Sequence, residues 1–189
     1  MQETILQKGV YTEGKVWHLT MKSDISSSEE KYRRALDLLQ NGTSPYFDRD
    51  ALSLLEAAAK EGHGEAAYLA GSLHCYGSFN ILANQIKAEV YTKMAVDAGI
   101  TLALFQLINI LDYAHDAAQI STYIGRLQSM AQNRDFPAMD ILVRLVQKYR
   151  VEDIGISEEI KRSIISNAAQ CGIASAQVPY ISTMLHPKK

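Results

Sequence analysis

The sequence predicts an all-α protein in which about four helix pairs stack one after another as a solenoid. An alanine–glycine–alanine pattern recurs along the chain at spacings of 37, 35 and 38 residues, which is the period of two-helix solenoid repeats. Hydrophobic residues make up 47% of the 189, enough to form a sizeable core without disulfides or metal ions. An ordinary helical bundle that contains similar strings is the alternative architecture.

Residues 1–27 differ in kind from the rest of the chain. Their segment ETILQKGVYTEGKVWHLTMK mixes β-branched and aromatic residues around the turn-prone Thr12-Glu13-Gly14, which predicts a short β-hairpin. An isolated hairpin is marginally stable in water, so we expect it either to pack on its own chain or to add to a partner. The segment has no basic stretch followed by an apolar one, so we expect no secretory signal and a cytoplasmic protein.

Residues 28–42 are predicted to form a helix that caps the first repeat. Ser27 is a suitable N-cap, with Glu30 three residues further on, and Gly42 and Pro45 follow the helix. The predicted apolar face consists of Tyr32, Ala35, Leu36 and Leu39. The alternative is that this helix is the second helix of a degenerate repeat.

Four repeats follow the capping helix. DALSLLEAAAKEGHGEAAYLAGSL starts at Asp50, and KAEVYTKMAVDAGITLALFQLINIL starts at Lys87 and aligns with it without a gap. The third copy, YIGRLQSMAQNRDFPAMDILVRL, has Arg134 at the position of the glycine, and the fourth, IKRSIISNAAQCGIASAQVPYISTML, restores the glycine. The signature residues are Ala51, Ala58, Gly62 and Ala66, then Ala88, Ala95, Gly99 and Ala103, then Ala138, and finally Ala168, Gly172 and Ala176.

Glycine and alanine recur in these copies for physical reasons. Each unit reads as helix, tight turn, helix. The glycine takes the left-handed conformation that closes the first helix, which costs an L-residue roughly 1–2 kcal/mol. The methyl-sized alanines let two antiparallel helices approach closely. We expect the repeats at residues 48–83, 84–116, 117–154 and 155–189.

The strings LLEAAAKEGHGEAAYLAGSLHCYG and YTKMAVDAGITLALFQL resemble Sel-one-like repeats, a branch of the tetratricopeptide-like superfamily. The resemblance covers roughly residues 48–185. The first copy closes with Tyr76 and Gly77, as units of that family do, whereas the second has Asp112 and Tyr113 there. The resemblance implies a right-handed α–α superhelix whose concave surface, lined by the first helix of each unit, holds peptides or protein partners.

The partner-binding residues should then come from the polar side of the first helices. With Ala51, Leu55 and Ala58 facing inward, alignment of the copies places ten residues on the opposite side. They are Ser53, Glu56, Lys60, Val90, Lys93, Asp97, Gln128, Gln132, Ser166 and Gln170. This set predicts a polar groove of mixed charge that suits an extended protein segment. A merely solvated helix face is the alternative for any one position.

Charge and cysteine content limit the function classes. The chain has 19 Lys and Arg against 21 Asp and Glu, a formal charge of −2, so we expect neither nucleic acid nor a membrane surface as a partner. The most apolar run, residues 100–111, is far too short to span a bilayer. The two cysteines, Cys75 and Cys171, suggest no disulfide framework, and we expect both to be small buried residues.

No catalytic or metal-binding constellation stands out. None of the five histidines (His18, His63, His74, His115 and His186) is spaced as a metal ligand, so we predict no metal and no cofactor. His74 and Cys75 are neighbours on a helix and point about 100° apart, which argues against a catalytic dyad.

Asp112, His115 and Asp116 form the best remaining cluster for acid–base or metal chemistry. They lie where one unit turns into the next, which favours a solvated loop. The sequence therefore predicts a cytosolic adaptor or regulatory binding protein that is not an enzyme. One alternative is an immunity protein that neutralises a bacterial toxin by binding it, a role that the resemblance to Sel-one-like repeats allows. The other is a hydrolase that uses the loop from Asp112 to Asp116. The sequence predicts no oligomeric state.

Overall fold

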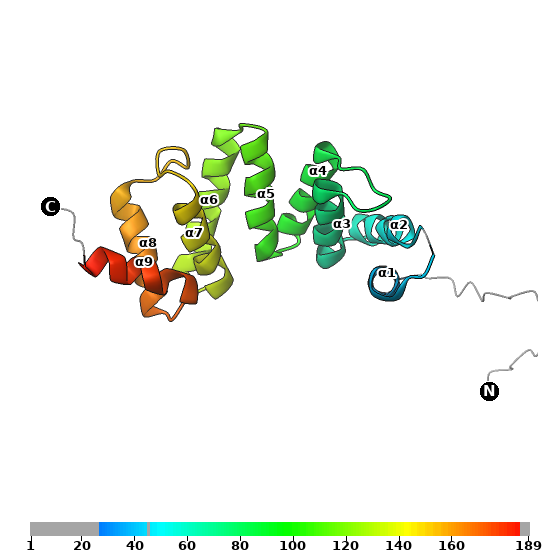
Figure 1. The fold of residues 1–189 in the computed structure, drawn as a ribbon, viewed down its shortest axis with the longest axis horizontal. Helices are drawn as coiled ribbons and strands as arrows, with labels where there is room; N and C mark the ends of the chain where they lie inside the picture. Colours follow the sequence, from blue (N-terminus) through cyan, green and yellow to red (C-terminus); the bar gives the residue numbers. More distant parts are fainter. Residues whose placement is uncertain (1–26, 45, 186–189) are drawn as a thin grey trace, which may run out of the picture.

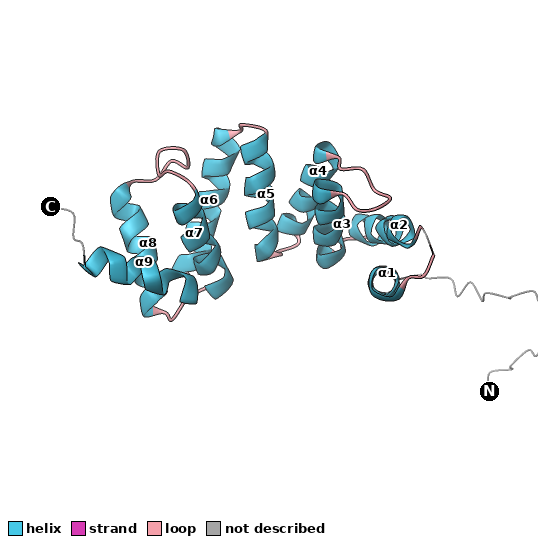
Figure 2. Ribbon diagram, viewed as in Figure 1, coloured by secondary structure: helices cyan, strands magenta, loops and turns pink. Residues whose placement is uncertain are grey.

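The computed structural model describes residues 27–44 and 46–185, and in this part of the chain it contains helices and no strand (Figures 1 and 2). The helices are α1 (Ser28–Asn41), α2 (Phe47–Lys60), α3 (Gly64–Tyr76), α4 (Gln85–Asp97), α5 (Thr101–Tyr113), α6 (Ala117–Gln132), α7 (Phe136–Lys148), α8 (Glu158–Gln170) and α9 (Ala174–Leu185). Four pairs, α2–α3 through α8–α9, follow α1 in a row, so the predicted solenoid is confirmed. The hairpin predicted for residues 1–27 lies outside the described residues.

Helix α1 starts at the predicted residue. The Ser27 hydroxyl accepts a hydrogen bond from the backbone N–H of Glu30 at 3.1 Å, which satisfies one of the donors that every helix N-terminus leaves open. Ala35 is fully buried where α1 packs on α2. The apolar face of α1 therefore packs on the first helix of the first pair.

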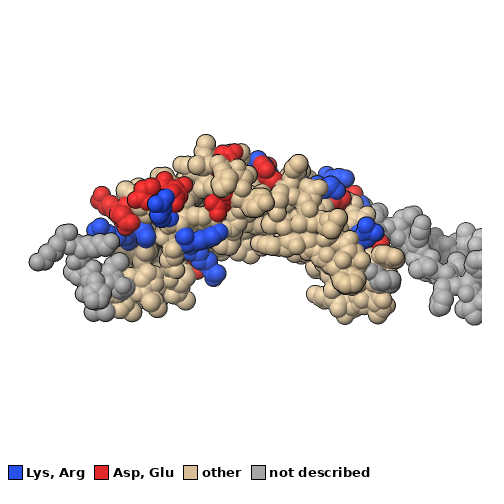
Figure 3. Space-filling model, turned by 45° about the horizontal axis from the view of Figure 1, so that its top comes forward, with Lys and Arg blue, Asp and Glu red and all other residues tan. Residues whose placement is uncertain are grey.

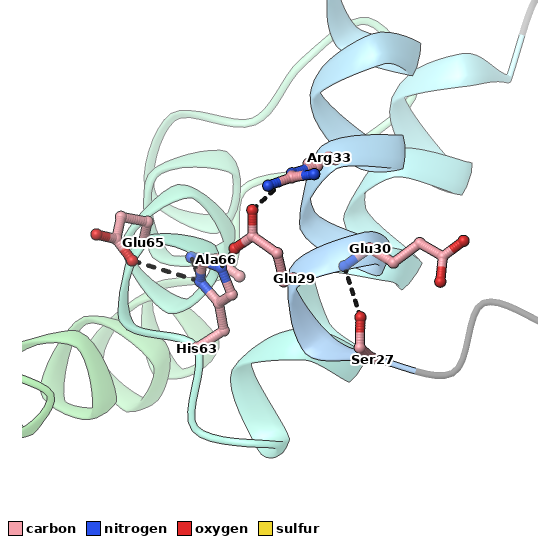
Figure 4. A network of polar contacts seen from close by, with 7 residues as sticks. All are labelled: Ser27, Glu29, Glu30, Arg33, His63, Glu65 and Ala66. Carbon is pink, nitrogen blue, oxygen red and sulfur yellow. Dashed lines mark hydrogen bonds and ion pairs between the residues drawn. The ribbon is translucent and has the colours of Figure 1, made fainter.

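Polar contacts join α1 to the turn between α2 and α3 (Figure 4). Nε2 of His63 lies 3.0 Å from a carboxylate oxygen of Glu29, and Nδ1 of His63 accepts a hydrogen bond from the backbone N–H of Ala66. Lys31 pairs with Glu61 in the same turn. Helix α1 is thus held by contacts beyond its apolar face.

The turn inside each helix pair has the same left-handed residue. Gly62, Gly99 and Gly172 have φ of 92°, 89° and 81°, and Arg134 has φ of 61° at the equivalent place in the third pair. Glycine adopts this conformation without strain, whereas a residue with a Cβ pays roughly 1–2 kcal/mol. The third pair therefore keeps the turn at the expense of strain at Arg134.

The signature alanines fill the space between the helices. They are Ala51, Ala58, Ala66, Ala88, Ala95, Ala103, Ala138, Ala168 and Ala176, and each is at most 1% exposed. Larger side chains, such as Leu55, Leu107 and Leu127, are fully buried beside them. One continuous core therefore runs along the row of pairs, with a smaller cluster around Val143 and Ala168 at the C-terminal end.

The junction between the first two pairs, where α3 lies on α4, is closely packed. A Cβ added to Gly71 of α3 would lie 2.5 Å from the hydroxyl oxygen of Thr92. The buried amide of Gln106 donates to this hydroxyl at 3.1 Å and accepts from the Ser72 hydroxyl at 2.8 Å. Buried polar groups with partners fix the relative position of two surfaces, so this junction is closed and specific.

The row of pairs curves into an arch (Figure 3). Most charged side chains on the face shown lie along the outward-curving side, and the lower ends of the arch carry few of them. No helix in the two described stretches is both long and apolar enough to cross a membrane.

Neither cysteine is buried as the sequence predicted. Cys75 is half-buried, but Cys171 is exposed. Cys171 is the residue that ends α8, directly before the left-handed Gly172, and the surface turn leaves its side chain in solvent.

Candidate functional site

All ten residues predicted to bind a partner lie on the first helices of the pairs, and none is buried. Five of them line two hollows in the surface. Ser53 and Glu56 line the smaller hollow, and Gln128, Gln132 and Gln170 line the larger. Lys60, Val90, Lys93, Asp97 and Ser166 line neither hollow.

The larger hollow is a groove of about 630 Å³ between α6 and α8. On the other side of this junction, the Ser175 hydroxyl of α9 donates to Asp140 of α7 at 2.6 Å, and Gln147 donates to the Ser175 carbonyl at 3.0 Å. The second helices of the last two pairs are therefore tied together while the first helices stand apart. Side chains of α7, Met139 and Leu142, form the floor of the groove.

The groove has amide rims over an apolar floor. Gln128 and Gln132 come from α6, and Asn167 and Gln170 from α8. The side chains of Gln128 and Gln132 make no hydrogen bond within the described chain. Side-chain amides both donate and accept, which matches the alternating N–H and C=O groups of an extended backbone.

Arg134 is the one charged residue among those that line this groove within the described chain. It is also the residue with the strained φ of 61°. Residues with strained backbone conformations are common at functional sites. Here an arginine in place of the glycine puts a guanidinium at the rim. This arrangement favours a carboxylate on whatever occupies the groove.

The smaller hollow, of about 320 Å³, lies between α2, the start of α4 and the loop before α4. Glu56 is less available here than the sequence suggested, because its carboxylate lies 2.7 Å from Nε2 of His74. Burial opposes ionisation of Glu56, but the hydrogen bond from His74 and the nearby Lys87 outweigh it and lower the pKa of this carboxyl. The buried His74 ring stacks on Tyr91, so we assign the pair a packing role.

A buried carboxylate holds the loop beside this hollow. Asp48 is 2% exposed and accepts hydrogen bonds from the Ser78 hydroxyl, the Asn80 backbone and side chain, and the Arg49 backbone. Burial alone would raise the pKa of Asp48, but these hydrogen bonds lower it to about 2. No sequence pattern points to Asp48, because Ser78 and Asn80 lie some 30 residues further along the chain.

In the cluster of Asp112, His115 and Asp116, the two carboxylates make other contacts. Asp112 accepts a hydrogen bond from the Tyr149 hydroxyl at 2.9 Å, and Asp116 caps α6 by accepting from the backbone N–H of Gln119 at 3.0 Å. His115 is exposed in the turn with φ of 57°. The two carboxylates therefore make structural contacts at the junction between pairs, and the arrangement does not favour catalysis.

No group of three or more His, Cys, Asp or Glu side chains in the described part of the chain is arranged to hold a metal ion. Burial raises the pKa of the Cys75 thiol, which leaves it little thiolate character near neutral pH.

A row of helix pairs with these features defines the class of α-helical repeat proteins. No family model and no curated protein matches the chain. Among solved structures, it is similar to the crystal structure of a protective antigen present in uropathogenic Escherichia coli strains, which displays an SLR fold, with a TM-score of 0.66 and 18% sequence identity.

This match covers 83% of the present chain and 33% of the antigen, so the chain spans about a third of that protein's length. The chain therefore has the Sel-one-like repeat fold, and the fold that the resemblance implied is confirmed.

Proposed function

We propose that this chain is a protein-interaction module that holds an extended segment of a partner protein in the groove between α6 and α8. The observation that carries the proposal is the combination of an apolar floor with rims of side-chain amides, of which those of Gln128 and Gln132 have no hydrogen-bond partner in the described chain. Apolar side chains of a partner segment would pack on the floor, and its backbone would bond to the amides. Without a catalytic constellation, binding itself is the proposed activity.

A cytosolic adaptor or regulatory binding protein is the role that this activity suits. The chain carries nearly balanced charge, so recognition would rest on shape and hydrogen bonding rather than on long-range attraction. A toxin held by an immunity protein is one class of such partner, and identification of the partner distinguishes this role from that of an adaptor.

The test compares three forms of the tagged protein. The rim variant combines Gln128→Ala, Gln132→Ala and Gln170→Ala, and the control is Ser129→Ala, which lies on α6 but does not line the groove. The protein that co-purifies with wild type from the native cells is identified, and its affinity for all three forms is measured.

We expect the rim variant to bind at least about tenfold more weakly, since each lost hydrogen bond is worth about 0.5–1.5 kcal/mol, and the control to bind like wild type. Equal affinity for wild type and the rim variant would contradict the groove as the binding site.

A further inference from the structure

The loop between α3 and α4 carries the most exposed apolar side chains of the described chain. Phe79 is 94% exposed and Leu82 is 92% exposed, and Tyr76 and Ile86 at the two ends of the loop are 74% and 79% exposed. Single exposed apolar residues need no explanation, but four of them within residues 76–86 mark a site of interaction. We call residues 76–86, which comprise the loop and the helix ends on either side of it, the display loop.

The display loop is held rigid from beneath. Asp48 receives hydrogen bonds from Ser78 and Asn80, as described above, and the backbone N–H of Asn84 donates to the His74 carbonyl at 2.7 Å. Ile81, between the two exposed side chains, is 8% exposed and acts as an anchor. The loop therefore fixes its central residue inside and leaves Phe79 and Leu82 outside.

The start of the loop is also fixed by its backbone. Gly77 has φ of 72°, and a Cβ added there would lie 2.7 Å from the carbonyl oxygen of Ile81. Ser78 and Ile81 form a short antiparallel bridge across the turn. A loop ordered before binding loses little conformational entropy when a partner arrives, so its exposed side chains are suited to act as anchors.

Positive charge lies next to the exposed side chains. The smaller hollow is lined by Leu82 of the loop and by Arg49 and Lys87. Arg49 is exposed and forms no ion pair within the described chain, and Lys87 lies 3.5 Å from Glu56. The hollow therefore has two positively charged side chains and one carboxylate, that of Glu56, which is already hydrogen-bonded to His74.

We propose that the display loop docks a partner protein whose contact segment combines an apolar side chain with a carboxylate. The apolar side chain packs against Phe79 and Leu82, and the carboxylate enters the hollow and pairs with Arg49 and Lys87. This contact is separate from the groove between α6 and α8 and does not depend on it.

A protein segment fits these residues better than a lipid surface does. The hollow is concave and has room for a side chain, whereas binding to a bilayer surface depends on a large buried apolar area together with attraction to anionic lipids. Attraction to anionic lipid grows by about 1 kcal/mol per cation, and recognised lipid-binding sites gather roughly four to eight of them. Only two cations line this hollow.

The test uses a displayed library of random linear peptides as the probe. Peptides are selected on the immobilised full chain and counter-selected on the variant Phe79→Ser/Leu82→Ser. Both side chains are more than nine-tenths exposed, so this variant should melt at the wild-type temperature. We expect the recovered peptides to carry an apolar residue next to Asp or Glu.

The affinity of the synthetic peptides then tests each part of the proposal. We expect at least about tenfold weaker binding to Phe79→Ser/Leu82→Ser and to Arg49→Glu. Tyr113→Ser, which removes an aromatic side chain of similar exposure elsewhere, should bind like wild type. The groove rim variant should also bind these peptides normally, which separates this proposal from the proposed function.

Four results would overturn the proposal. They are peptides that bind the double variant as well as wild type, recovered sequences without acidic residues, self-association of wild type that the double variant lacks, and adsorption to phosphatidylserine vesicles that the double variant lacks. The third result would assign the loop to a second copy of the chain, and the fourth to a membrane.

Discussion

The junction between the first two helix pairs is closely packed where α3 lies on α4, whereas the junction between the last two leaves a groove between its first helices. In the first, Gly71 lets α3 lie against Thr92, and buried hydroxyl and amide groups bond across the contact. In the last, α7 and α9 are tied together while α6 and α8 leave a groove of about 630 Å³. The same repeat signature therefore supports either a sealed contact or a binding surface, and the residues outside the signature decide which.

The largest effect is expected in the closed N-terminal region, at Asp48. Asp48→Asn removes the charge that four donors surround. Hydrogen bonds to a charged group are worth about 1.5–3 kcal/mol, so we expect a loss of that order in the free energy of unfolding at pH 7. Denaturant unfolding of the variant and wild type measures it, and a loss below about 0.5 kcal/mol would mean that Asp48 does not hold the loop.

The effect of Asp48 should depend on pH in a defined direction. Its pKa falls from 3.8 in the unfolded chain to about 2 in the folded protein. A carboxyl with a lowered folded pKa contributes stability that is fully present above the unfolded value and is lost as the pH falls toward the folded value. The stability difference between wild type and Asp48→Asn should therefore shrink from pH 5 to pH 2, and a difference that stays constant over this range would contradict the assignment.

Two helical glycines offer a matched comparison of a closed and an open site. Gly71→Ala places a methyl 2.5 Å from the Thr92 hydroxyl, and the overpacking, reduced by the gain in helix propensity, should cost about 1–2 kcal/mol. Gly125→Ala on α6 meets nothing within 4 Å and should stabilise by about 0.5–1 kcal/mol. Thermal unfolding compares them, and equal effects at both sites would show that the first junction is not closely packed.

The strained turn of the third pair gives the next smaller effect. Arg134→Gly should stabilise the protein by about 1 kcal/mol, because it relieves a positive φ. The reverse change, Gly99→Arg, should destabilise by about the same amount, since space around Gly99 is free and only the backbone opposes it. If Arg134 is kept for binding, the stabilised variant should also lose affinity for the groove's partner. If the variant is stabilised and binds the partner as wild type does, Arg134 has no role in binding.

The smallest effect is expected at the turn between the second and third pairs. His115→Ala changes an exposed side chain, so stability should shift by no more than about 0.5 kcal/mol, and partner binding should be unchanged. Any activity that this substitution abolishes would revive the hydrolase hypothesis. Denaturant unfolding and partner affinity are the measurements.

The sequence predicted the path of the chain well because the fold depends on local signals. Gly62, Gly99 and Gly172 end their helices with positive φ, and a glycine at that place is visible without knowing any distant contact. Arg134 adopts the same conformation without the glycine, because the packing of α6 on α7 around it overrides the local preference. Only the spacing of the copies could reveal that turn.

Contacts between helix pairs were harder to foresee. Gln106 is a polar residue within the most apolar run of the sequence, yet it lies buried and bonds to Ser72 and Thr92 from two other helices. Asp48 likewise depends on partners in a loop far along the chain. Periodicity assigns a residue to a face of its helix, but it does not say which neighbour meets that face.

The candidate site shows the same limit. Alignment placed the predicted residues on the first helices, but it could not show that α6 and α8 stand apart. Gln128 and Gln132 therefore line a groove, whereas Lys60 and Asp97 do not. The display loop spans the end of the first repeat and the start of the second, where only Tyr76 and Gly77 belong to the signature. Its exposed Phe79 and Leu82 carry no periodicity from which burial could be inferred.

Cys171 allows the most direct test of the account, because it is exposed and lines the groove. A bulky maleimide attached to this thiol would fill the space between α6 and α8, while the half-buried Cys75 should react slowly because burial raises its pKa. The affinity of the identified partner is then measured for labelled and unlabelled protein. The account predicts that labelling at Cys171 weakens binding at least about tenfold, and an unchanged affinity would show that the partner does not occupy the groove.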